Sequence, residues 1–411
     1  ADFFASIFLQ RPDLALYIRI AAVSVLFQVI FTTSSSAFVG LDKTEYSALS
    51  ANIQAISKAI ISITLVLLGF SIAGAIIGYV ASYFVAAIIG SFILLLLTRE
   101  KKNDQNDGSV SNDLKTIMRY GAPLYISLLL AGFIPLYQNV ILAIFTTDTD
   151  IGNYKAATNF ISLMTTVAVP ITTALLPAFS KLNSSTTQKV KAFYRHANKY
   201  AAMLIIPITF LIIILSKEIV EAIYGYTYQS APVFLTIYSL LYFLVGFGYL
   251  VLPSLYNGLG ETKITLKMSL ITFLTLAVLS PIFTRTYNVQ GLIVAFLIAS
   301  TGGTIYGLYV ARKNFQISID INTVLKIYLN SAVSSVPVFI VLHLVHLPKF
   351  LSITIGGLLY LFLYMTLTPL TKTVTLFELE TALHIIRKIR LFALVAKPIL
   401  IYQQKLAHIR I

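Results

Sequence analysis

Three positively charged side chains stand inside long apolar stretches of this sequence, where a charge is costly. Arg19 and Lys155 lie near the ends of two such stretches, and Lys58 lies near the middle of a third. An ionisable group at such a depth usually faces a water-filled cavity or a partner, because hydrocarbon does not solvate it. Cations in a wet cavity would bind an anionic group. The alternative for Arg19 and Lys155 is that they snorkel to the membrane surface, for which Lys58 lies too deep.

Uncharged polar side chains accompany these cations. Gln138 and Asn139 are adjacent within one apolar stretch, and Asn159 follows Lys155 by one helical turn. Hydrogen bonds between helices would explain such residues, and contact with sugar or water would explain them equally well. The candidate cavity residues are Arg19, Lys58, Gln138, Asn139, Lys155 and Asn159.

Carboxylates are absent from the deep parts of the apolar stretches: all 16 Asp and Glu residues lie in links, at stretch ends or in the tail. A pump driven by protons or Na⁺ needs an acid within the membrane whose pKa changes with conformation. There is no cysteine, and no paired-acid motif or Gly-rich phosphate loop occurs. We therefore expect neither an enzyme nor a bound metal or cofactor.

Prolines occur within two neighbouring apolar stretches. Pro123, Pro135 and Pro170 each remove a backbone hydrogen bond and bend a helix. Bent helices suit a protein that opens alternately to the two sides of a membrane, so these residues are hinge candidates. Kinks that serve packing alone are the alternative.

The elements that must position these residues are membrane-spanning helices. The chain is 57% hydrophobic and only 11% charged, with a mean hydropathy of +0.85, whereas an ordinary soluble domain carries about 25% charge. A helix needs about 20 apolar residues to cross the hydrocarbon layer. Eleven such stretches are present: 14–38, 47–69, 72–97, 120–145, 152–179, 197–215, 232–257, 264–284, 289–311, 323–346 and 350–370.

Basic residues gather in every second link, which predicts the orientation. These links include Lys43, the segments 101–119 and 181–199, Lys263 with Lys267, Arg312 with Lys313, and the tail. By the positive-inside rule that side is cytoplasmic, so the C-terminus is expected in the cytoplasm of a multi-pass plasma-membrane protein. The net charge of +14 then reflects topology and attraction to anionic lipid, not binding of nucleic acid.

Residues 12–99 and 232–312 look like two copies of one unit. Each opens with proline, runs to a glycine turn (Gly40 and Gly258), places another glycine at its last stretch and ends on a basic residue. Many transporters are built from such repeats. The second copy follows three stretches that have no counterpart before residue 12, so we expect the first bundle to be incomplete at its N-terminal end.

Several motifs together resemble those of a known transporter family. They are Arg119-Tyr-Gly-Ala-Pro123, Ile151-Gly-Asn-Tyr-Lys-Ala-Ala157, Leu176-Pro-Ala-Phe-Ser-Lys181, Ile223-Tyr-Gly225 and the Gly258-Leu-Gly turn. In order and spacing they resemble the O-antigen-type and lipid II-type polysaccharide flippases of the MATE-like multidrug/oligosaccharidyl-lipid/polysaccharide exporter superfamily.

The resemblance implies an all-α fold of two six-helix lobes around a cavity, often with two extra helices. Mapped on this chain, it gives a partial first lobe (1–99), a cytoplasmic link (100–119), a second lobe (120–312), an extra helix pair (313–372) and a cytoplasmic amphipathic tail (373–411). We expect the tail helix that begins near Leu376 to lie along the membrane surface with its leucine side in lipid.

The function that the resemblance implies is translocation of a polyprenyl-phosphate-linked glycan from the cytoplasmic to the outer leaflet. Glycan assembly enzymes are further candidate partners. The main alternative is a cation-coupled multidrug exporter of the same superfamily, for which a cavity lined by cations is unfavourable because it repels cationic compounds. A membrane-embedded glycosyltransferase is disfavoured because the outer links are too short to hold its acidic groups.

Overall fold

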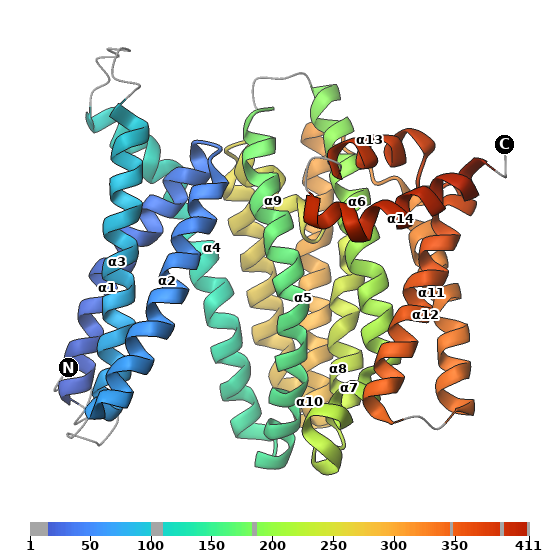
Figure 1. Cartoon of the computed structure of the whole chain (residues 1–411), viewed down its shortest axis with the longest axis horizontal. Helices are drawn as coiled ribbons and strands as arrows, with labels where there is room; N and C mark the ends of the chain where they lie inside the picture. The colour runs from blue at the N-terminus through green and yellow to red at the C-terminus, as the bar shows by residue number, and fades with distance from the viewer. Residues whose placement is uncertain (1–14, 100–109, 183–186, 346–347, 387–389, 409–411) are drawn as a thin grey trace. The chain divides into compact units, whose positions relative to one another are not determined.

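A computed structural model of the chain describes residues 15–99, 110–182, 187–345, 348–386 and 390–408, and within these every regular element is helical (Figure 1). The predicted all-α membrane fold is therefore confirmed. It follows from the bilayer, where backbone N–H and C=O groups find no water and must bond within their own helix. The chain divides into two compact units, residues 1–112 and 113–411.

Unit 1 contains three long helices, α1 (Ala15–Gly40), α2 (Thr44–Leu65) and α3 (Ser71–Arg99), with the π-helical turn η3 (Val66–Phe70) between the last two. Gly69 (φ 92°) and Ser71 (φ 47°) break the helix there. The chain reverses at this break, since a Cβ on Gly78 would lie 2.5 Å from the Cα of Ser62. α2 and α3 are thus a hairpin in which glycine allows the two backbones to touch.

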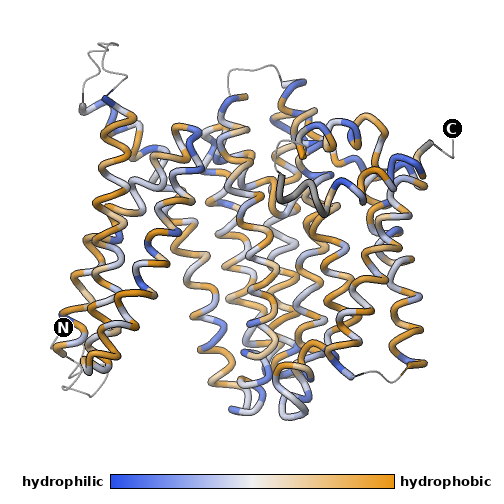
Figure 2. Tube along the Cα trace, viewed as in Figure 1, coloured by the Kyte–Doolittle hydropathy of each residue, from blue (hydrophilic) through white to orange (hydrophobic). Residues whose placement is uncertain are grey.

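Unit 2 contains the remaining helices. They are α4 (Val110–Phe145), α5 (Asp148–Ser180), α6 (Thr187–Ile214), α7 (Ser216–Tyr224), η4 (Gly225–Thr227), α8 (Ala231–Ser239), η5 (Leu240–Phe247), α9 (Val251–Gly258), α10 (Thr262–Phe315), α11 (Ile321–Leu344), α12 (Lys349–Leu370), α13 (Leu376–Ile386) and α14 (Arg390–His408). α5 packs against α8 and α9, and α6 packs against η5 and α11. Large fully buried residues such as Tyr194, Tyr256 and Leu252 fill the centre, while much of the outer surface of the helices is apolar (Figure 2).

The long helix α10 is a second hairpin. Tyr287 and Asn288 (φ 51°) break it, and a Cβ on Gly291 would lie 1.9 Å from the carbonyl oxygen of Phe283. Further along, Gly303 lies against the backbone of Met268. The two halves of α10 therefore run antiparallel in close contact.

These hairpins explain the number of spans. Eight of the described helices are long and apolar enough to cross a membrane, or nine if the bent pair 231–247 and 251–258 counts as one span. Two of the eight, Thr44–Arg99 and Thr262–Phe315, contain 56 and 54 residues, and a straight helix of that length would be about 80 Å long. Because each folds back on itself, each supplies two crossings, which accounts for the eleven predicted spans.

The backbone supports the predicted duplication. Asp42 and Gly260, both with positive φ, occupy the turns that precede the two hairpins. The same number of residues separates Ser71 from Asn288, Gly74 from Gly291 and Gly90 from Gly307. Matching breaks and matching close approaches are what two copies of one folding unit would retain.

The helix predicted near Leu376 is present as α13. Leu379 and Leu383 are only 2% and 8% exposed, so these two leucines pack against the protein and not against lipid, whereas Phe377 is 77% exposed. The position of α13 along the membrane surface stays a prediction. The segment 100–109 of the predicted link and the basic residues Arg387 and Lys388 lie outside the described residues.

Gly291→Ala is expected to destabilise the second hairpin, because its Cβ would collide with the Phe283 carbonyl. Overpacking of this kind costs about 1–3 kcal/mol, visible as a lower melting temperature in detergent. Gly302→Ala is the matched control in the same helix, since its Cβ meets only Ile271 at 3.7 Å. Equal melting temperatures for the two variants would contradict the close approach.

Candidate functional site

Helix α5 carries a line of exposed polar side chains along one face. The spacing of four, three, four and seven residues returns to the same side of a helix at each step. This α5 polar face consists of Lys155, Asn159, Ser162, Thr166 and Thr173, all of them exposed. The opposite side of the helix is buried in the centre of unit 2, for example at Tyr154 and Met164.

Lys155 contacts a neutral partner. Its Nζ donates to the Oδ1 of Asn139 on α4 at 2.7 Å. The structure therefore brings together two residues that the sequence singled out separately. Because an amide carries no charge, this hydrogen bond orients the ammonium group without neutralising it.

The other two candidates on these helices differ in burial. Asn159 is exposed, and its Nδ2 donates to the phenol oxygen of Tyr224 at 3.0 Å. Gln138 is only 3% exposed and accepts a hydrogen bond from the hydroxyl of Tyr154 at 3.3 Å. Within unit 2, Gln138 thus joins α4 to α5 inside the bundle, whereas Asn159 belongs to the α5 polar face.

The Gly152-Asn-Tyr motif fixes this end of α5. The Oδ1 of Asn153 accepts from the backbone N–H groups of Ser230 and Ala231, each at 3.0 Å, and so caps the start of α8 from a different helix. Tyr154 meanwhile bonds to Gln138. With residues 153 and 154 held inside, Lys155 must turn outward. The sequence pattern gave no indication of this capping role.

Unit 1 holds a second polar group, around Lys58. Its Nζ lies 5.2 Å from the centre of the Tyr79 ring, a cation–π distance, and Tyr79 is a partner that the sequence reading missed. Nearby on α2, Gln54 donates to the hydroxyl of Ser82 at 3.0 Å. Arg19, the remaining candidate of this unit, is exposed near the start of α1.

The hinge candidates lie inside continuous helices. Pro123 and Pro135 are within α4, and Pro170 is within α5. Pro170 cannot donate to the carbonyl four residues earlier, which is that of Thr166 on the α5 polar face. The hinge role of these prolines stays a prediction.

The acidic residues of α5 precede its polar face in the chain. The acids of α5, Asp148 and Asp150, are confined to its first turn. Among the described residues, no group of three His, Cys, Asp or Glu side chains lies close enough to hold a metal ion. The chemistry of the α5 polar face is thus that of one cation and a series of neutral hydrogen-bonding groups.

Asn153→Ala is expected to lower the melting temperature, because the α8 cap is lost together with a buried hydrogen bond. The cost of losing a helix cap is about 1–2 kcal/mol. Asn159→Ala, in the same helix but exposed, serves as the control and should change the melting temperature little. An equally large decrease of the melting temperature in Asn159→Ala would contradict the distinction between a buried, structural Asn153 and an exposed Asn159.

Comparison with known proteins gives a family match to part of the chain and one fold. Residues 1–183 match the family described as polysaccharide biosynthesis protein. No curated protein matches the sequence significantly. The structure is similar to that of the lipid II flippase MurJ in its inward closed conformation, with a TM-score of 0.61 and 19% identity over 86% of this chain and 73% of MurJ.

Multidrug exporters share the same fold. The outward-facing structure of a multidrug resistance MATE family transporter of the MOP superfamily gives a TM-score of 0.65 at 18% identity, covering 76% of this chain and 72% of that one. The Vibrio cholerae MATE transporter VcmN in the bent form gives 0.62 at 15% identity, covering 75% and 72%. These comparisons show that this multi-pass chain has the fold of the MurJ flippase and the MATE transporters, and that its residues 1–183 match the family of polysaccharide biosynthesis proteins.

Proposed function

We propose that this protein moves a lipid-linked oligosaccharide or polysaccharide precursor from the cytoplasmic to the outer leaflet by alternating access. The observation that carries the proposal is the α5 polar face, a cation followed by amide and hydroxyl groups on the exposed side of a membrane-spanning helix. Hydrocarbon would not solvate such a face. The family match to polysaccharide biosynthesis proteins supports the same substrate class.

The cations suit a phosphate-linked headgroup. Lys155 contacts an amide and Lys58 an aromatic ring, so neither contact is an ion pair that would compete with an anion. Two opposite unit charges 4 Å apart attract with about 4 kcal/mol at the effective dielectric constant typical near a protein surface. Arg19 is the third cation that we assign to this role.

The hydroxyl groups suit the sugars. Ser162, Thr166 and Thr173 donate their own protons to carbonyls of α5 at 2.5, 3.0 and 2.9 Å. Their oxygens still have lone pairs, which can accept from the hydroxyl groups of a glycan or from water. The prenyl chain needs no such partners and remains in the bilayer.

The arrangement disfavours export of cationic drugs. Such a pump needs a carboxylate within the membrane, but the described spans carry Asp and Glu only in their terminal turns or caps, as at Asp113, Asp148 and Glu261. A face whose single charged group is a lysine also repels cationic compounds.

The orientation and the lobes belong to the same proposal. We assign the basic end of α6, with Lys189, Lys191 and Arg195, to the cytoplasmic side by the positive-inside rule, which places the tail there too. In this proposal, residues 1–99 and 120–312 form the two lobes, and residues 313–372 form the extra helix pair. Anionic lipid at the plasma membrane's inner surface and glycan assembly enzymes are the further partners proposed.

Flipping by the purified protein tests the assignment directly. In proteoliposomes with a fluorescent polyprenyl-phosphate-linked sugar, Lys58→Gln and Lys155→Gln should each slow translocation at least tenfold, while Lys155→Arg should retain it. Lys217→Gln is the matched control, since Lys217 is a 68% exposed lysine outside the proposed site.

Normal flipping by both folded Gln variants would contradict the role of the cations. Failure of the unsubstituted protein to flip the lipid, together with proton- or Na⁺-dependent export of a cationic dye, would favour the multidrug alternative.

A further inference from the structure

Helices α11 and α12 lie along the side of unit 2 that is formed by α6 and α7. α12 runs antiparallel to that side: Lys349 lies at Glu221, Gly356 against Leu215, and Tyr364 at Met203. In Figure 1 the two helices stand beside α6 and α7, with α13 at the opposite end from α7. Contacts therefore exist at both ends and in the middle.

At the α7 end, an ion pair joins α12 to the bundle. The Nζ of Lys349 lies 2.7 Å from Oε2 of Glu221, whose side chain is 12% exposed. Lys217 is a weaker partner of the same carboxylate, at 4.0 Å and 68% exposed. Since Glu221 is largely buried, removing Lys349 would leave a carboxylate with only a solvated neighbour.

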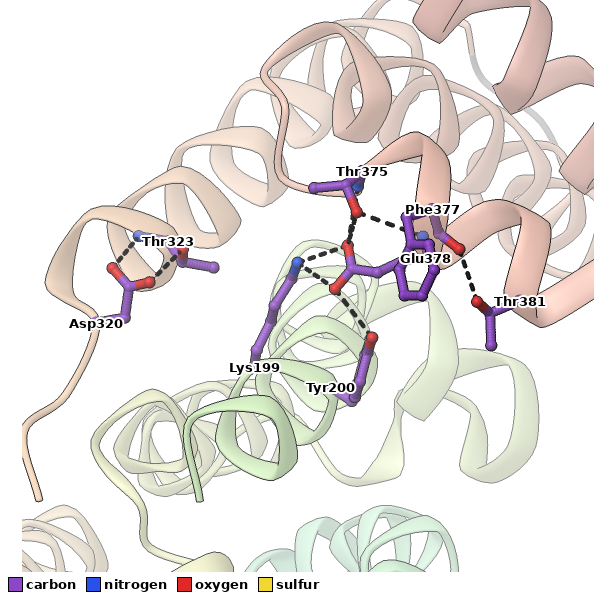
Figure 3. Close-up of polar contacts among 8 residues, drawn as sticks. All are labelled: Lys199, Tyr200, Asp320, Thr323, Thr375, Phe377, Glu378 and Thr381. Atoms are coloured by element: carbon purple, nitrogen blue, oxygen red, sulfur yellow. Dashed lines mark hydrogen bonds and ion pairs between the residues drawn. The ribbon is translucent and has the colours of Figure 1, made fainter. Parts of the chain in front are cut away.

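At the other end, Glu378 of α13 joins the tail to α6 (Figure 3). Its carboxylate accepts from the Nζ of Lys199 at 2.7 and 2.8 Å and from the hydroxyl of Tyr200 at 2.9 Å. Both members of the ion pair are about seven-eighths buried, at 15% and 13% exposure. Such a charge-assisted contact has a definite geometry, unlike a solvated surface pair.

The Glu378 carboxylate also caps the N-terminus of α13. The N–H and hydroxyl of Thr375 donate to Glu378 at 2.8 and 3.0 Å, and the Glu378 N–H donates to the Thr375 hydroxyl at 3.4 Å, which is a capping box. Burial raises the pKa of Glu378, but the bonds from Lys199, Thr375 and Tyr200 outweigh it and hold that pKa below its ordinary value. Glu378 is therefore ionised at neutral pH, and the contact persists until the pH falls below the usual carboxyl range.

Between the two ends, the hydroxyl of Tyr364 donates to the carbonyl of Met203 at 3.1 Å. Tyr360 and Tyr364 of α12 and Val338 of α11 form a buried cluster, against which Phe210 and Ile214 of α6 pack. α11 packs on α6 as well, with Ile327 against Ala202 and Ile206. Apolar packing is non-directional, so the ion pairs at the two ends add contacts of defined geometry.

We propose that the ion pairs Lys349–Glu221 and Lys199–Glu378 clamp α11, α12 and α13 to the helices α6 and α7, so that they move as one body when the transporter changes conformation. The inference concerns the motion of unit 2 and holds whatever the substrate is. We call the Lys199–Glu378 contact a strap, because it holds α13 over the end of the bundle. The carboxylate that makes this contact also caps α13.

The absence of native cysteine allows a direct test by electron–electron distance measurement. Spin labels at Leu204→Cys on α6 and Leu358→Cys on α12, both exposed positions, should give one narrow distance distribution in nanodiscs. It should stay unchanged on adding Na⁺, acid to pH 5.5 or a lipid-linked sugar. In the Lys349→Ala/Glu378→Ala variant the distribution should broaden, and in the control Lys217→Ala, which keeps both clamp pairs, it should stay narrow.

Two or more distances in the otherwise unsubstituted protein would overturn the clamp, and so would an unchanged distribution in Lys349→Ala/Glu378→Ala. If that variant fails to fold, the distance distribution of the spin-labelled protein with both ion pairs intact still tests the clamp. As a second measurement, a short thiol crosslinker between Lys199→Cys and Glu378→Cys should leave flipping within twofold of the uncrosslinked protein. A tenfold loss on crosslinking would mean that the strap must open. Absence of flipping before crosslinking would count against the proposed function only.

Discussion

Hydrocarbon offers no partner to a hydrogen-bonding or charged group, and the arrangement of this protein follows from that constraint. Every regular element among the described residues is a helix, because only a helix satisfies its own backbone in lipid. Long apolar helices then need a reason to associate, which here is close packing: Gly78 and Gly291 let two backbones touch where any side chain would collide. Polar side chains within the spans can then join one helix to another, as Gln138 of α4 does with Tyr154 of α5.

The polar residues divide into those that build the bundle and those that remain on its surface. Asn153, Gln138 and Tyr154 are buried and join α4, α5 and α8. Lys155, one residue further along, points outward as a consequence and begins the α5 polar face. Residues 153–155 therefore both hold the bundle together and begin its polar surface. The contact of this lysine with Asn139 is with a neutral amide, which fits the anionic headgroup that we propose as its ligand.

Ion pairs take a different place in the molecule. The ion pairs Lys349–Glu221 and Lys199–Glu378, whose carboxylates are largely buried, connect the bundle to the first turns of α12 and α13. At these depths a carboxylate can be partly hydrated and still be shielded from competing water, so a pair is strong enough to restrain motion. The cations proposed for transport, Lys58 and Lys155, thus contact neutral groups, whereas Lys199 and Lys349 contact carboxylates.

Sequence alone was sufficient for the features that depend on composition along the chain. Apolar length determines the spans, the glycine and turn positions reveal the repeat, and the depth of Lys58 and Lys155 marks them as unusual, because each follows from the cost of placing a residue in hydrocarbon. The i, i+4, i+7 spacing from Lys155 to Ser162 was also readable, although only the pair Lys155 and Asn159 was singled out. Tertiary structure decided what no local pattern encodes: that Asn139 meets Lys155, that Asn153 caps α8, and that the leucine side of α13 is buried with Glu378 on Lys199. These contacts join residues from different helices, and which helix faces pack together depends on the whole bundle at once.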